Sequence, residues 1–290
     1  MGERSRRAPA TRGGRQAPRD WHVPRAAHLY EDPSSPTLDP RAVSDFLNET
    51  LGIRSTVRGD FFTVHGGTDL ESLAKAIAAT KVRALGRPFE SQEPLFGEVQ
   101  FELRLLRDPA KLVPGILYDA FRYADVLRGL LPPEERNLRT LHVVFGHRLI
   151  GTFDEDGRYH ARTVLCGVPS LVSTSGIVEG PAKPPEYYKV KARLSLALGA
   201  VPFDAAKEPF AGRFVDYDDP RLTEVAKGYA LQAAWYHVTK EAFCDDPACR
   251  LFDAHWQSEI LAAQIASGRL CVRHATVAAR IRALARQRKG

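Results

Sequence analysis

The sequence lacks any long apolar run, and nowhere in its 290 residues does it approach the roughly 18 apolar residues that a membrane helix needs. Its first residues also lack the continuous apolar segment of a signal peptide, which argues against export. They are rich in arginine and poor in acids, like a transit peptide, but their prolines and glycines disfavour an amphipathic helix. We therefore expect a cytoplasmic protein with no membrane partner.

Cysteine is scarce, with four residues in the whole chain. Four cysteines in a cytoplasmic chain of this length do not indicate a disulfide framework, whereas clustered pairs in that setting more often bind metal. The hydrophobic fraction of 44% and the charged fraction of 26% are ordinary for a soluble globular protein, and no internal repeat is evident.

The net charge of +6 is concentrated at the two ends of the chain. Residues 1–25 carry seven arginines against Glu3 and Asp20, a net of +5, and residues 275–290 carry four arginines and a lysine with no acid, another +5. By subtraction (+6 − 10) the remainder is at −4. A basic folded face is thus not implied, but weak non-specific contact with nucleic acid through the basic ends stays open beside a purely solubilising role.

The chain divides into a disordered basic tail over 1–27, one domain over 28–274, and a basic C-terminal helix or tail over 275–290. Early strands alternate with helices and the last third is helical, so the pattern predicts an α/β or α+β fold with a mixed sheet and packed helices. A helix over 39–52 is indicated by Asp39 as its cap, Pro40 in its first turn and Gly52 at its end.

The remaining elements follow from hydrophobic periodicity. Strands are expected over 53–62, over 96–106 and, in two or three pieces with a hairpin turn at 155–157, over 140–166. Residues 167–190 look too rich in proline for a helix and are expected to be strand and loop. Helices are expected over 68–85, 114–133, 221–241, 253–268 and from about 275.

Two close pairs of ligand-type residues, one Cys/Cys and one Cys/His, lie near the C-terminus in the pattern C-x4-C-x21-C-x2-H. Structural zinc sites are tetrahedral, use cysteine thiolates and histidine nitrogens, and usually gather their ligands as two close pairs. The pattern predicts a structural zinc held by Cys244, Cys249, Cys271 and His274 within a segment 244–274. Two alternatives remain: His255 replaces His274 as the fourth ligand, or the thiols bind no metal.

This stretch resembles the C-terminal end of the archaemetzincins, zinc peptidases with the signature H-E-x-x-H-x-x-G-x-x-H-C-x4-C-x-M followed by a further C-x-x-C. The resemblance covers about 233–274 and implies a zincin-like fold stapled by a structural zinc. A second resemblance, over about 28–274, is to an uncharacterised, mainly archaeal family named as metallopeptidases. It is carried by the segments VVFGHRLIGTF, STSGIVEGPAKPPEYY and GYALQAAWYHVTKEAFCDDPACRLFDAHWQ.

The same resemblance leaves the catalytic set of the signature largely missing. Its second histidine falls on His237, but the first histidine and the general base fall on Ala233 and Ala234, and the third histidine falls on Phe243. Alanine can neither bind zinc nor accept a proton, so hydrolysis through this motif is not expected and a second, catalytic zinc is doubtful. His237 lies on an apolar helix face and is interpreted as a core histidine.

Weaker candidates for chemistry lie elsewhere. His237 and Glu241 are four residues apart and could meet on one helix face, and His142, His147 or His160 could reach His237 across the interface between sheet and helix. A serine-rich turn at 173–180 lacks a nucleophile elbow, the acidic loop of Asp216, Asp218 and Asp219 is interpreted as solvated, and Cys166 is interpreted as a core thiol.

Three functions compete on these grounds. The leading one is a protein of the metallopeptidase type that keeps the structural zinc without the recognisable peptidase machinery, with a peptidase or amidase using a rearranged site as its catalytic form. The second is a non-catalytic module that binds a peptide or protein partner. The third is a nucleic-acid-associated protein that acts through its basic ends.

Overall fold

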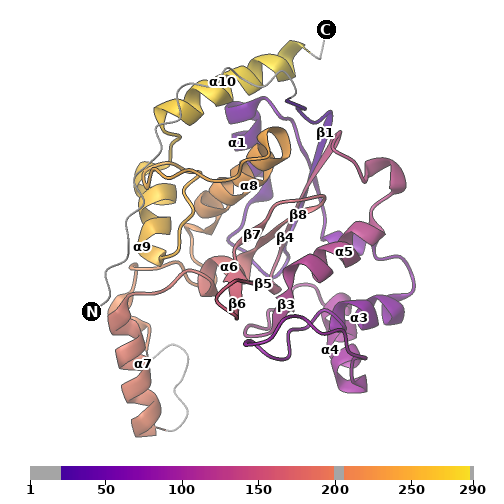
Figure 1. Cartoon of the computed structure of the whole chain (residues 1–290), viewed down its shortest axis with the longest axis vertical. Coiled ribbons are helices and arrows are strands. Elements are labelled where there is room, and N and C mark those ends of the chain that lie inside the picture. The colour runs from indigo at the N-terminus through magenta and orange to yellow at the C-terminus, as the bar shows by residue number, and fades with distance from the viewer. Residues whose placement is uncertain (1–20, 199–205, 288–290) are drawn as a thin grey trace.

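A five-stranded sheet forms the centre of the fold in the computed structural model, which describes residues 21–198 and 206–287 (Figure 1). Its strand order is β2-β1-β4-β8-β7, in which β7 is antiparallel to β8 and the other neighbours are parallel. The strands are β1 (Ala26–Tyr30), β2 (Thr56–Arg58), β4 (Thr140–Gly146), β7 (Val164–Leu165) and β8 (Ser170–Ser173). The antiparallel strand β7 thus ends the sheet on one side.

A smaller sheet lies beside the first, with the order β3-β5-β6. It consists of β3 (Leu117–Asp119), β5 (Leu149–Phe153) and β6 (Tyr159–Arg162), and β5 and β6 form the hairpin expected around residues 155–157. Together the two sheets and their helices confirm the predicted mixed α/β architecture.

Helices cover both faces of the main sheet (Figure 1). Successive strand residues point to opposite faces, so Leu29, Val143 and Phe145 pack under α1 (Pro40–Leu51), α8 (Leu222–Thr239) and α10 (Val272–Gln287). Tyr30 and Val144 pack on the other face, under α2 (Phe61–His65), α3 (Leu70–Ala78) and α5 (Ala120–Leu130). The first of these two cores holds the C-terminal helices in place.

The remaining helical segments lie around this frame. They are α4 (Phe96–Arg107), α6 (Thr174–Glu179), α7 (Pro185–Leu198), the short α9 (Gln257–Ile260) with the π-helix Leu261–Ser267 that follows it, and the 3-10 turns Pro133–Glu135 and Glu208–Phe210. None of the helices within the described residues is long and apolar enough to cross a membrane.

The helix expected over 39–52 is confirmed with its caps. The Asp39 side chain accepts hydrogen bonds from the backbone N–H groups of Arg41 and Ala42, and Gly52 has the left-handed φ of 71°. These residues end the helix where the sequence indicates, because each supplies a partner or a conformation that the helix terminus requires.

Several predicted segments are wrong. The helix expected over 68–85 ends at Ala78, and the helix expected over 114–133 begins only at Ala120, after the strand β3. Residues 96–106 were expected to be a strand but form the helix α4. The prediction failed because Glu102 interrupts the apolar stripe by which a helix is recognised. This residue is fully buried, and its carboxylate lies 2.9 Å from both Lys81 and Arg148. Residues 174–179 form α6 and α7 begins at Pro185, within a stretch expected to be strand and loop. Ser173 caps α6 by accepting the Gly176 N–H at 2.8 Å.

The tail predicted over 1–27 lies largely outside the described residues, which begin at residue 21. At the other end, α10 extends from Val272 to Gln287, so the predicted helix from about 275 begins one turn earlier and packs on α1.

Candidate metal centre

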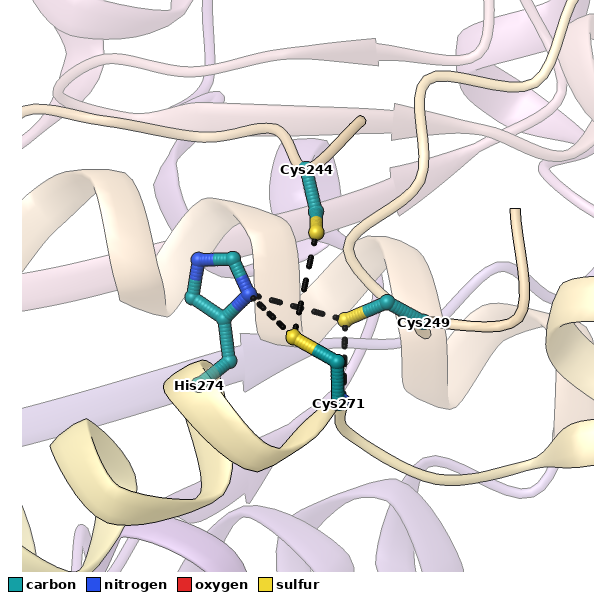
Figure 2. A group of neighbouring side chains, drawn as sticks. All are labelled: Cys244, Cys249, Cys271 and His274. Carbon is teal, nitrogen blue, oxygen red and sulfur yellow. Dashed lines mark hydrogen bonds between the residues drawn. The ribbon is translucent and has the colours of Figure 1, made fainter. Parts of the chain in front are cut away.

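Two segments separated by 21 residues bring Cys244, Cys249, Cys271 and His274 together (Figure 2). Cys244 and Cys249 lie in the loop that follows α8, and Cys271 and His274 lie at the start of α10. The chain leaves α8 at Lys240, which has a left-handed φ of 65°, and returns through α9 and the π-helix that ends at Gly268. The second pair of ligands is thereby placed next to the first.

Backbone and side-chain bonds fix the loop that carries the first pair. The Cys244 N–H donates to Leu251 O at 2.7 Å, and the Arg250 N–H donates to Arg269 O at 2.9 Å. The buried Arg250 guanidinium donates to Gly268 O and pairs with Glu224 on α8, and it lies 4.8 Å from the Phe46 ring. The loop is therefore tied both to α8 and to the segment before Cys271, which positions the two ligand pairs relative to each other.

The four ligand atoms all lie within 4.8 Å of one another. The Sγ atoms of Cys244 and Cys271 are 3.9 Å apart, and His274 Nδ1 lies 3.6 Å from Cys249 Sγ and 3.2 Å from Cys271 Sγ. A tetrahedral zinc with Zn–S of about 2.3 Å and Zn–N of about 2.0 Å separates its ligand atoms by about 3.5–3.8 Å. The cluster therefore has donor chemistry and spacing that are compatible with a bound metal ion.

Burial makes the thiolate forms of this cluster unfavourable in the absence of a cation. It raises the pKa of Cys244 to about 12, with the neighbouring thiols of Cys249 and Cys271 adding to the effect, and it raises the pKa of Cys249 as well. Two backbone N–H groups, those of Asp246 and Cys271, donate to the sulfurs of Cys244 and Cys249 at 3.4 Å each. These donors favour thiolate sulfur, and a divalent cation would complete the compensation of its charge.

The imidazole of His274 packs against Trp235, whose ring meets it edge-on with 5.1 Å between centroids. Burial, and then the charge of Arg273, lower the pKa of His274 to about 4, so the ring is neutral as a ligand must be. Ligation through Nδ1 places the ring hydrogen on Nε2, which lies 3.1 Å from the Arg273 guanidinium. Since arginine has no acceptor, ligation through Nδ1 would require this contact to change.

His255, the alternative fourth ligand, lies outside the cluster. It is exposed, its Nδ1 lies 2.8 Å from Asp253 O, and its backbone N–H donates to Glu259 Oε2 at 2.7 Å. The fourth residue that the structure places beside the three cysteines is His274.

The two weak catalytic candidates are not brought together. His237 is 2% exposed and its Nε2 lies 2.9 Å from Leu138 O, so it is the hydrogen-bonded core histidine expected from its helix face, and burial lowers its pKa. The expectation that Glu241 shares a helix face with His237 is wrong, because α8 ends at Thr239, Lys240 has a left-handed φ, and the exposed Glu241 lies beyond the helix.

The expectation that a strand histidine could meet His237 is also wrong. His142 points to the sheet face opposite α8, where its Nδ1 lies 3.0 Å from the Tyr30 hydroxyl. His147 lies 3.9 Å from Asp32, and His160 contacts Asp156 at 2.9 Å. Cys244, Cys249, Cys271 and His274 form the one cluster of three or more potential ligands within residues 21–198 and 206–287.

The other polar motifs of the sequence have structural partners. Asp216 pairs with Lys207 and Asp219 with Arg221, both at 2.7 Å, so two of the three acids are ion-paired and the interpretation of a solvated loop is wrong for them. Ser173 is the cap of α6, and the Cys166 thiol is half-buried, 3.9 Å from Gln232 O.

A groove of about 780 Å³ lies between the edge of the main sheet and the end of α8. Its wall contains both residues of the edge strand β7 together with β6, and the opposite side is formed by Tyr236 and the loops around Phe243 and His255. Phe121 and Phe243 line it and are 60% and 46% exposed, respectively. Sequence reasoning did not identify this groove or the role of Arg250, because both depend on segments that meet only in the folded chain.

The fold and the cluster together define an α/β protein with a Cys3His group of metal-ligand type in its helical C-terminal part. Residues 23–281 match the family described as "Probable metallopeptidase family (DUF6775)", and since this is most of the chain, the protein belongs to that family.

A crystal structure of a zinc-dependent peptidase from Methanocorpusculum labreanum (strain Z) is weakly similar. The two chains share 14% sequence identity with a TM-score of 0.39, and the similarity covers 87% of this chain and 98% of the other. The search of curated proteins gave no match.

Proposed function

We propose that this metallopeptidase-family protein has a zincin-like fold of archaemetzincin type, keeps a structural zinc, and binds an extended peptide or protein segment without hydrolysing it through the degenerate motif. The observation that carries this proposal is the position of His237. It is the one histidine retained from the catalytic pattern, and it is buried and bonded to a backbone carbonyl.

The surroundings of His237 support the loss of hydrolysis. Ala233 and Ala234, at the positions of the first histidine and the general base, are fully buried in α8, and Phe243 stands at the position of the third histidine. A catalytic zinc needs three protein ligands and an open position for water, and these side chains offer one imidazole that is already engaged.

The zinc expected at the Cys3His group would have a structural role. All four protein ligands come from one compact cluster, which leaves no coordination position for water in a tetrahedral site. When bound, zinc supplies a cross-link between the loop after α8 and the first turn of α10. The residues of the chain determine its placement through Arg250, Trp235 and the two backbone N–H groups that donate to sulfur.

The groove beside β7 supports the binding of an extended segment. β7 ends the sheet, so one of its sides offers backbone N–H and C=O groups to a further strand, and the whole strand lies in the groove wall. Addition of a peptide strand to an exposed sheet edge is a recurring mode of recognition, in which backbone bonds give affinity and neighbouring pockets give specificity. Exposed Phe121 and Phe243 would contact apolar side chains of the bound segment.

A phage-displayed library of linear peptides, selected on the full chain, tests this proposal. We expect selected peptides to bind the wild type, to lose at least about tenfold in affinity with Phe243→Ala, since removing a contact worth about 1.4 kcal/mol changes affinity tenfold, and to remain intact during the assay. Phe96→Ala is the matched control, because Phe96 is 80% exposed on α4 and is not among the residues that line the groove.

Two results would contradict the proposal. The first is equal binding by Phe243→Ala and the wild type, which would place the partner elsewhere. The second is cleavage of the selected peptides that chelator stops and that His237→Ala abolishes, which would assign the chain a working catalytic metal.

A further inference from the structure

The surface of the C-terminal segment carries arginines without acids. Residues 269–287 contain Arg269, Arg273, Arg280, Arg282 and Arg286 and no aspartate or glutamate. Four of the five are exposed and Arg282 is half-buried. Within the described residues none of the five is ion-paired, whereas the nearby Arg221 and Arg250 each bind a carboxylate. The positive charge of this segment is therefore not neutralised by its surroundings.

The fold holds these arginines on a rigid support. α10 packs on α1 through its buried Ala278, Ile281 and Ala285. The approach is close at Gly52, where an added Cβ would lie 3.2 Å from the Ala285 Cβ. At its other end the helix begins between Cys271 and His274 of the metal cluster. The basic residues thus belong to a folded element and differ from a flexible tail.

Helical spacing distributes the arginines over two flanks of α10. Arg282 and Arg286 are one turn apart and share one flank, while Arg273 and Arg280 are two turns apart and share another. Between the two flanks, the outward face of the helix carries the exposed uncharged residues Val272, Thr276, Ala279 and Ala283.

A hollow of about 360 Å³ lies beside the first flank, where α10 meets the end of α1. Arg54, Arg282 and Arg286 line it, with Glu49 as the one carboxylate among its lining residues. Arg282 is oriented there by donating from Nη1 to Glu49 O at 2.8 Å. Three guanidinium groups around one hollow offer the forked donors that match phosphate oxygens.

We propose that α10 and this hollow form a surface that binds the phosphodiester backbone of duplex DNA. An α-helix with its side chains is about 10–12 Å wide, and the major groove of B-DNA is about 12 Å wide. The uncharged outward face of α10 matches the width of such a groove, and the arginines on its two flanks then face the phosphates of the two strands. With phosphate contacts alone, recognition is independent of base sequence.

The metal cluster supports this surface, in a coupling that rests on the structural zinc proposed above. Cys271 and His274 fix the first turn of α10, which places Arg273 and the axis of the helix. The arginine surface itself does not include a metal ligand, so the two proposals fail separately.

Salt-dependent binding of the full chain to a mixed-sequence DNA duplex, followed by fluorescence anisotropy, tests the surface. We compare the wild type with R280Q/R286Q and with the control R104Q/R107Q, which removes two exposed arginines from α4. Each phosphate contact contributes about 0.9 to the slope of log K against log salt, so R280Q/R286Q is expected to lower its magnitude by about 1.8. The control should keep the wild-type slope, and both variants should keep their metal.

Unchanged slopes in both variants would overturn the proposal and assign any binding to the arginines of residues 1–25. Equal losses in both variants would also overturn it, because they would report net charge alone. Binding to vesicles of anionic phospholipid with no binding to the duplex would assign the surface to a membrane and would equally refute it.

Chelation is the second arm of the experiment. We expect chelator-treated wild type to bind the duplex more weakly than untreated protein, while R280Q/R286Q binds weakly with its metal in place. Equal affinity of treated and untreated wild type would refute the coupling between metal and helix.

Discussion

Substitution of Cys249 by serine removes the most buried ligand of the cluster. Cys249 is fully buried, its sulfur accepts the Cys271 N–H at 3.4 Å, and it lies 3.6 Å from His274 Nδ1. The loop after α8 and the start of α10 meet at this atom, so its loss opens the cross-link between them. Serine retains the size of the side chain but is a poor zinc ligand, and we expect Cys249→Ser to release the metal.

The size of the effect follows from linkage. A ligand that binds the folded chain alone stabilises it by RT ln(1 + [L]/Kd), which is about 4 kcal/mol when free metal exceeds Kd about a thousandfold. For chains of about 150–250 residues each kcal/mol shifts Tm by about 2–4 °C. We therefore expect the melting temperature of Cys249→Ser to fall by about 8–16 °C, with a similar fall when the wild type is treated with chelator.

Metal content by elemental mass spectrometry and Tm by scanning calorimetry measure both parts of this prediction. Cys166→Ser is the matched control, since Cys166 lies outside the cluster and contacts Gln232 O. It should keep its metal and most of its stability. A Cys249→Ser protein that retains both metal and wild-type Tm would refute the reasoning.

Two further predictions concern the buried histidines. His237→Ala should leave the metal content unchanged and lower the free energy of unfolding by about 1–3 kcal/mol, because Leu138 O loses its hydrogen-bond donor; metal loss measured in this variant would contradict its structural role. For His142, burial and then the charge of His28 lower the pKa from 6.5 to about 4, so the unfolded chain binds the proton more readily. Stability should hence be complete above pH 6.5 and decline by up to about 3 kcal/mol as the pH falls through 4. His142→Gln should remove this part of the pH dependence in urea denaturation, and an unchanged profile would assign it to other groups.

The metal cluster was within reach of sequence reasoning because its signal is local. Cys244 and Cys249 are so close in the sequence that one short loop can direct both thiols to the same point. The helical segment that follows then returns the chain, so that Cys271 and His274 lie beside them. The choice of His274 over His255 required the fold, since both lie within reach of the same loop along the chain.

Other features depend on contacts that no local pattern carries. The helix α4 could not be recognised from its sequence because the charged Glu102 occupies a buried position on it. That position is tolerated because Lys81 and Arg148, from distant segments, compensate the charge of Glu102. Glu241 was misplaced because Lys240, a residue with no special preference for a left-handed conformation, ends α8. His142 could be assigned to one side of its strand, but which helices cover that side is decided by the order of the strands in the sheet.

The number and coordination of metal ions in the purified protein test the central claim most directly. Elemental analysis combined with X-ray absorption at the zinc edge reports both quantities on the intact chain. We predict one zinc per chain, surrounded by three sulfurs and one nitrogen, and none in Cys249→Ser. Two zinc ions per chain, or one whose neighbours are mainly nitrogen and oxygen, would contradict it.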